Sequence, residues 1–217
     1  MKTFENVNLC NRNGTNCYIL RGSVGDILID TGVEEERANI EEWLDGYDVR
    51  LIILTHGHFD HAGNAAYFAN KYSAKIAMSR YDYRLSQGLA KHTLYPVSPL
   101  GAVFAKLTGM NGKAYKGNDP FKADIFLCEG DTLDEYGVDA MIIDLQGHTR
   151  GSIGVLHGND LYVGDALVNT FYPATPAIAE SPRHTYKTVD YIKNIRPKRI
   201  LPGHGMPFDF SGRITII

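Results

Sequence analysis

Cysteine is scarce in this chain, and so are long apolar runs. The 217 residues include three cysteines, at positions 10, 17 and 128, and no two of them form a C-x-x-C pair. An odd number of cysteines without such a pair argues against a disulfide framework and against a sulfur-rich zinc site. Neither an N-terminal apolar segment nor a run of 18 apolar residues is present, so we expect no secretion signal and no membrane span. We therefore expect a cytoplasmic protein.

Blocks of basic residues are missing as well. Lys and Arg number 22 against 25 Asp and Glu, and the formal net charge is -3. Without a basic stretch, a nucleic-acid backbone is a poor candidate partner, and we expect a small-molecule substrate instead. The hydrophobic share of 44% is typical of a compact globular chain, so we predict one domain over residues 1–217. Whether the chain forms a homodimer is left open by the sequence.

Strand-like and helix-like patterns alternate along most of the chain. Apolar strand-like runs occupy residues 16–22, 25–32, 50–55, 74–79, 137–147, 151–158, 160–165 and 198–205, and helical spacing occupies 34–44, 65–72 and 185–195. This alternation predicts a layered α/β fold. Residues from about 79 to 128 are rich in Tyr, Gly and Pro and have weak periodicity, which predicts an inserted surface segment of loop or helix. That segment is either a cap over a site, a surface decoration or a dimer contact.

One stretch, THGHFDHAGN, holds three histidines and an aspartate within six positions, directly after the apolar run RLIILT. Imidazole and carboxylate groups bind zinc and similar metals, and catalytic sites keep one position open for water. In an extended backbone His56 and His58 point to the same side and can reach one cation. Asp60 and His61 follow where the chain turns into a helix, which suggests a second cation. A loop with solvated histidines is the alternative, and the density of these residues disfavours it.

Polar residues also end four other apolar runs. They are Asp30 after ILI, His148 after MIIDLQG, Asp165 after LYVG and His204 after RILPG. Loops at one end of the sheet form the ligand crevice in layered α/β folds, so these residues can converge with the histidine motif.

The motif H-x-H-x-D-H, followed by GHTRGSIG, VGDAL and PGHG, resembles the signature of the metallo-β-lactamase-fold hydrolases. The resemblance runs from the DTG that begins at residue 30 to the PGHG that ends at residue 205, and it implies a four-layer αββα sandwich. It further implies a first metal held by His56, His58 and His148, a second held by Asp60, His61 and His204, and Asp165 bridging the two. Asp30 would orient a ligand histidine from behind, or else be an ordinary turn aspartate.

The chemistry implied is hydrolysis. Two cations about 3.5 to 4 Å apart lower the pKa of a shared water enough to supply hydroxide near neutral pH. We therefore expect a binuclear metal-dependent hydrolase whose metal-bridging hydroxide attacks an ester-like carbonyl, with Asp60 orienting the nucleophile and moving its proton. An aspartate at position 165 favours the glyoxalase II-like branch, with thioesters as the first substrate class and lactones as the second. Zinc is our first expectation, although iron and manganese suit the same ligands.

Three alternatives stay open at this point. They are an iron-dependent oxidoreductase similar to the persulfide dioxygenases of this superfamily, an enzyme that hydrolyses β-lactams, and a non-enzymatic sensor built on the same fold. Arg150 stands where the family's GHTPG usually has proline, and it either contacts an anionic substrate or is solvated. His92, His157 and His184 match no ligand block, and we expect no role for them in metal binding.

Overall fold

A computed structural model describes residues 8–12, 14–87, 93–108, 120–211 and 213–217 of the chain. Its first sheet has six strands in the order β1-β2-β3-β4-β5-β7. Their bounds are Asn8–Arg12, Thr15–Leu20, Asp26–Ile29, Val49–Leu54, Lys75–Met78 and Ile125–Phe126. The first three strands pair antiparallel, and β3, β4, β5 and β7 run parallel. The parallel strands therefore end at one common edge.

The second sheet has five strands in the order β13-β12-β10-β9-β8. Their bounds are Phe208–Asp209, Arg199–Pro202, Asp160–Gly164, Ile153–His157 and Ala140–Asp144. The β10 and β12 strands are parallel, and the other pairs are antiparallel. A separate two-stranded ribbon pairs β6 (Tyr95–Pro96) with β11 (Ile178–Ala179).

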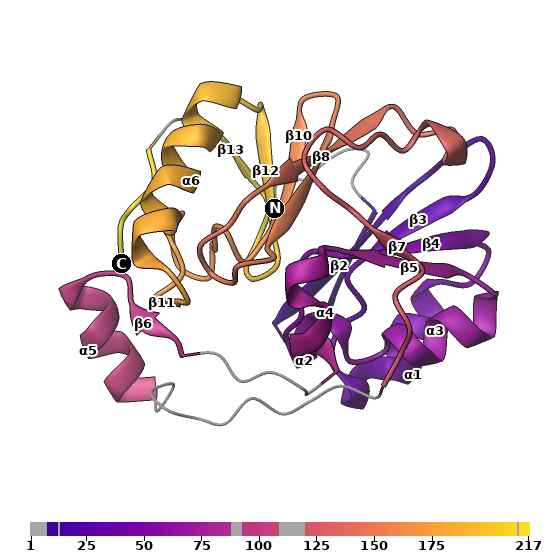
Figure 1. Cartoon of the computed structure of the whole chain (residues 1–217), viewed down its shortest axis with the longest axis horizontal. Coiled ribbons are helices and arrows are strands. Elements are labelled where there is room, and N and C mark those ends of the chain that lie inside the picture. The colour runs from indigo at the N-terminus through magenta and orange to yellow at the C-terminus, as the bar shows by residue number, and fades with distance from the viewer. Residues whose placement is uncertain (1–7, 13, 88–92, 109–119, 212) are drawn as a thin grey trace.

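Helices cover the outer faces of the two sheets (Figure 1). The α-helices are α1 (Arg37–Trp43), α2 (Phe59–Ala62), α3 (Ala65–Tyr72), α4 (Arg80–Ser86), α5 (Pro99–Thr108) and α6 (Pro182–Ile195), with short 3-10 turns at Glu34–Glu36 and Asp134–Tyr136. In the described residues, none of these helices combines the length and apolar character that a membrane crossing needs.

Three apolar clusters hold the layers together. Ile27 and Ile53 pack against Val155 and other residues of the second sheet, in a core between the two sheets. The alternate residues of the same strands, such as Ile52, face the helical layer of α1 and α3, where Phe68 is fully buried. A third cluster packs α6 on the outer face of the second sheet. Strands buried on both faces explain the continuous apolar runs in the sequence. The predicted four-layer αββα fold is therefore confirmed.

The structure differs from the sequence prediction at both ends of the segment 79–128. The α4 helix buries Asp82 and Leu85, and β7 adds an edge strand to the first sheet. These ends are therefore part of the core rather than a surface insertion. The sequence did not indicate this, because short segments without a long apolar period carry little signal. Residues 88–92 and 109–119 lie outside the described part, and a cap over the site stays a prediction.

We predict that Phe68→Ala destabilises the chain by about 3 to 5 kcal/mol, because it leaves a cavity in the helical layer. Phe68 is 0% exposed, whereas Leu107 on α5 is 82% exposed. Leu107→Ala is the control and should change the free energy of unfolding by less than about 0.5 kcal/mol. Urea denaturation followed by circular dichroism measures both. Equal effects would contradict the assigned core.

Candidate metal centre

The seven predicted ligands lie together where strands of both sheets end. The loop after β4 carries His56 and His58. The α2 helix begins at Phe59, so Asp60 and His61 lie in its first turn. From the second sheet, His148 follows β8, Asp165 follows β10 and His204 follows β12. Residues far apart in sequence thus meet because their strands end at the same place.

Three histidines form the first cluster. The Nδ1 atom of His58 lies 3.0 Å from Nε2 of His56 and 3.0 Å from Nε2 of His148. Nitrogens bound at about 2.0 to 2.1 Å around one tetrahedral zinc are about 3.3 to 3.4 Å apart, close to this spacing. These three residues could hold one metal ion.

The second cluster combines a carboxylate with two histidines. The Nε2 atom of His204 lies 3.4 Å from Nε2 of His61 and 3.2 Å from Oδ2 of Asp60. Asp165 lies between the clusters, with Oδ2 at 3.5 Å from Nε2 of His148 and 3.4 Å from Nε2 of His204. A single carboxylate is therefore placed to reach both candidate ions.

Contacts at Nδ1, the ring nitrogen that points away from the clusters, fix the orientation of three histidine rings. The Nδ1 atom of His148 lies 3.1 Å from the carbonyl oxygen of Ile178, and that of His204 lies 2.8 Å from the carbonyl oxygen of Gly14. The Nδ1 atom of His61 lies 2.8 Å from Oδ2 of Asp30. Carbonyl and carboxylate oxygens only accept, so each Nδ1 carries the proton. In a neutral ring this leaves the lone pair on Nε2, which points into the clusters.

Asp30 makes the predicted contact with a histidine of the set. It is buried, has a left-handed backbone with φ of 58°, and also accepts hydrogen bonds from the backbone N–H and the hydroxyl of Thr55, both at 2.8 Å. Such a conformation is costly for a residue with a side chain and persists where the surroundings impose it. Asp30 thus anchors His61 to the end of β4.

One buried oxygen supports the fit of a cation. Oδ1 of Asp165 is buried and accepts no hydrogen bond from the described residues, with Nε2 of His61 at 3.4 Å. A Cβ atom on Gly203 would lie 2.6 Å from that oxygen and 2.5 Å from Cε1 of His61. Buried oxygens without partners are rare, and a metal ion is one way to satisfy them. The glycine leaves the space that such an ion and its ligands require.

The pKa values show how charge is balanced in the protein without metal. Burial alone lowers the pKa of His61, but the neighbouring carboxylates, led by Asp165, raise it to about 10. The pKa of His204 is raised for the same reason. Burial raises the pKa of Asp165, but His204 and His61 hold it well below its usual range. Protons on these two histidines therefore balance the carboxylates.

In the first cluster the pKa values of two histidines are lowered instead of raised. Burial lowers the pKa of His56 and of His148, and the neighbouring His61 lowers the pKa of His56 further. Both rings are therefore neutral near pH 7. Neutral imidazole is the form that binds a metal.

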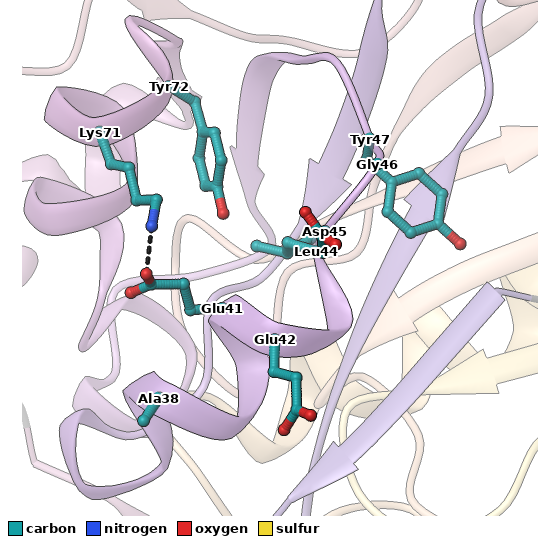
Figure 2. Close-up of a pocket in the computed structure, with 9 residues that line it drawn as sticks. All are labelled: Ala38, Glu41, Glu42, Leu44, Asp45, Gly46, Tyr47, Lys71 and Tyr72. Atoms are coloured by element: carbon teal, nitrogen blue, oxygen red, sulfur yellow. Dashed lines mark hydrogen bonds and ion pairs between the residues drawn. The ribbon is translucent and has the colours of Figure 1, made fainter.

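A separate pocket of about 530 Å³ opens beside α1 and α3, on the helical face (Figure 2). It contains none of the seven predicted ligands. Glu41 and Lys71 form an ion pair across it, and the Tyr67 hydroxyl donates to Glu41 at 2.8 Å. Two of the charged groups of this pocket, Glu41 and Lys71, are therefore partners of each other.

Other residues singled out in the sequence have different outcomes. The guanidinium of Arg150 stacks on Tyr81, 4.4 Å from the ring centre, and its proposed contact with an anionic substrate stays a prediction. His184 contacts Ser181, which caps α6, and His157 ends β9. His92 lies outside the described residues.

Sequence reasoning missed Asp82, a buried residue of α4 whose carboxylate contacts the loops of the first cluster. A lone aspartate in a short helix carries no motif. The only signal was its spacing with Leu85 and Ser86, which places all three on the buried face of α4.

Comparison with known proteins matches residues 10–204 to the sequence model described as "Metallo-beta-lactamase superfamily". The hydroxyacylglutathione hydrolase GloC of Haemophilus influenzae is 30% identical, over 82% of this chain and 79% of its own. The acyl-coenzyme A thioesterase MBLAC2 of Bos taurus is 24% identical, over 88% and 73%. The crystal structure of TTHA1623 in a di-iron-bound form has a TM-score of 0.66 and 24% identity, over 90% of this chain and 89% of that one. This last likeness shows the fold.

Two other curated relatives are much longer than this chain. The rhamnogalacturonan lyases YesX and YesW of Bacillus subtilis are each 26% identical, and the chain spans only 22% and 26% of their lengths. These partial matches assign no activity to the chain.

We predict that zinc binding to the metal-free protein releases about two protons per chain at pH 7.5, because His61 and His204 start as imidazolium and must become neutral. With the pKa of His61 raised to about 10, the proton is present throughout the neutral range. The apparent metal affinity therefore falls as the pH is lowered. Calorimetry in buffers of different ionisation enthalpy measures the release, and binding without proton release would contradict this charge balance.

Proposed function

This chain belongs to the metallo-beta-lactamase superfamily, and we propose that it is a binuclear metal-dependent hydrolase of ester-like substrates, with thioesters as the first class and lactones as the second. One observation carries the proposal. Two sets of three side chains that could each hold a metal ion lie side by side, and the carboxylate of Asp165 lies 3.5 Å from His148 of one set and 3.4 Å from His204 of the other. In this proposal His56, His58 and His148 hold one ion, preferentially zinc, and Asp60, His61 and His204 hold the other.

A pair of bound divalent cations supplies an activated water near neutral pH and polarises a carbonyl. The chain's own residues orient the reactants. Burial raises the pKa of Asp60, but His61 and His204 outweigh it and hold the pKa below its usual range, so Asp60 stays ionised. An ionised carboxylate accepts a hydrogen bond from the attacking water and can take its proton to the leaving group. Asp60 is thus the proposed catalytic residue.

Exposed apolar side chains lie close in the chain to several of the ligands, and we propose that they contact the acyl part of a substrate. Phe59 stands between His58 and Asp60 in the chain and is 41% exposed, and Met206 is 49% exposed. Phe171, at 83% exposure, lies on a loop whose Asn169 N–H donates to the His204 carbonyl at 2.9 Å. Apolar walls with a few polar groups are typical of small-molecule sites.

The two hydrolase relatives support thioesters in particular. Hydroxyacylglutathione and acyl-coenzyme A are both thioesters, and the proteins named for them match more than four fifths of this chain. The di-iron form of TTHA1623 makes iron the specific alternative to zinc.

The proposal is tested by a hydrolysis screen of thioesters, lactones, β-lactams and phosphoesters with protein of measured metal content. We predict that His58→Ala lowers thioester turnover by roughly 100-fold or more, because a ligand of the first ion is lost. His157→Ala is the matched control and should keep wild-type turnover. Equal turnover by His58→Ala would assign the activity to a contaminant. One iron per chain together with oxygen uptake on a persulfide would overturn hydrolysis in favour of redox chemistry.

We predict separately that Asp60→Asn lowers kcat by about 100-fold or more, since the amide cannot take a proton. The ion in the first cluster should remain, because the contacts of Asp60 with His61 and His204 belong to the second cluster. Steady-state kinetics with metal analysis of the same sample measure both quantities. A variant with two ions and unchanged kcat would remove Asp60 from the mechanism.

A further inference from the structure

Asp82 is a buried carboxylate outside the seven predicted ligands. It lies in α4 and is 2% exposed. Its Oδ2 atom accepts hydrogen bonds from the Gly57 N–H at 2.9 Å and from the Thr149 hydroxyl at 2.7 Å, and its Oδ1 atom accepts one from the Gly151 N–H at 2.8 Å. Three donors therefore compensate the burial of one charge.

The donors belong to the two loops that carry the first cluster. Gly57 stands between His56 and His58 in the loop after β4 of the first sheet, whereas Thr149 follows His148 in the loop after β8 of the second sheet. The Asp82 carboxylate thus ties together loops from different sheets. These three hydrogen bonds all come from the two loops that carry the first cluster, so the carboxylate is placed to act on that cluster.

Close packing restricts movement of the two loops relative to Asp82. A Cβ atom on Gly151 would lie 2.4 Å from Oδ1 of Asp82, and one on Gly57 would lie 2.9 Å from the Asp82 carbonyl oxygen. The hydroxyl of Ser79 caps the start of α4 by accepting from the Tyr81 N–H at 3.3 Å. Neither loop can shift far without breaking a hydrogen bond to the carboxylate or colliding with α4.

We propose that Asp82 is a positioning residue for the first metal ion, setting the distance between the nitrogen of His58 and that of His148. The inference rests on the metal site of the proposed function. Metal sites require ligands held within about 0.5 Å of the productive geometry, and the groups that hold ligands are worth about 10- to 100-fold in metal affinity. The 3.0 Å spacing of these two nitrogens is the quantity that Asp82 controls.

Asp82→Asn is the direct test. An amide presents only one oxygen, so its NH₂ group must face either the Gly151 N–H or the donors of Gly57 and Thr149. We expect a zinc titration against a chelating dye to show two ions per wild-type chain. In the variant, one ion should bind about 10- to 100-fold more weakly while the other keeps its wild-type affinity.

Asp26→Asn is the matched control. Asp26 is equally buried, at 3% exposure, and accepts from the Asp48 N–H at 2.9 Å, but it begins β3 at the end of the strand opposite Asp30. We expect it to lower the free energy of unfolding while both ions bind as in the wild type. Thr149→Val removes one donor to Asp82 and should weaken the same single ion by a smaller factor, which keeps the test valid if Asp82→Asn fails to fold.

Two outcomes would overturn the inference. One is unchanged affinity for both ions in folded Asp82→Asn, and the other is an equal loss at both ions that Asp26→Asn reproduces. Because the readout is metal binding, it does not depend on finding the substrate. A wild-type chain that binds no metal would instead overturn the proposed function, so the two failures are distinguishable.

Discussion

The structure depends on balancing negative charge that is removed from water. Asp30 and Asp165 are buried and Asp60 is half-buried, all within reach of histidine rings. Unpaired buried charges are too costly for a chain of marginal stability. Protons on His61 and His204 provide the compensation in the metal-free protein, and divalent cations provide it in the proposed active form. Both solutions need the same rings in the same orientations, which the hydrogen bonds from behind supply.

Neither sheet holds the centre by itself. The first sheet delivers the compact motif from His56 to His61, and the second delivers His148, Asp165 and His204 from the ends of three elements. The core between the sheets therefore fixes more than stability, since any slippage of one sheet on the other changes ligand distances. Asp82 adds a polar tie at the same junction, where apolar packing alone would leave the loops free to move.

The sequence indicated the layered α/β fold, because strands buried on both faces give long apolar runs. It also indicated all seven residues that the structure brings together, because polar residues at the ends of such runs are easy to recognise. It did not indicate β1 or β7, which lie at sheet edges and have little apolar periodicity. It also predicted a surface position for the ends of the segment 79–128, and it therefore missed the buried Asp82. A contact such as that between Asp82 and Gly151 spans 69 positions and depends on tertiary geometry, which no local pattern records.

The order of the ligands along the chain has a consequence for biosynthesis. The motif at residues 56–61 emerges early from the ribosome, but His148 completes the first set only much later, and His204 completes the second only after β12 has formed. Until residue 204 has been synthesised, a nascent chain therefore offers only part of the proposed coordination. We expect both ions to bind fully only to a polypeptide whose two sheets have already folded together.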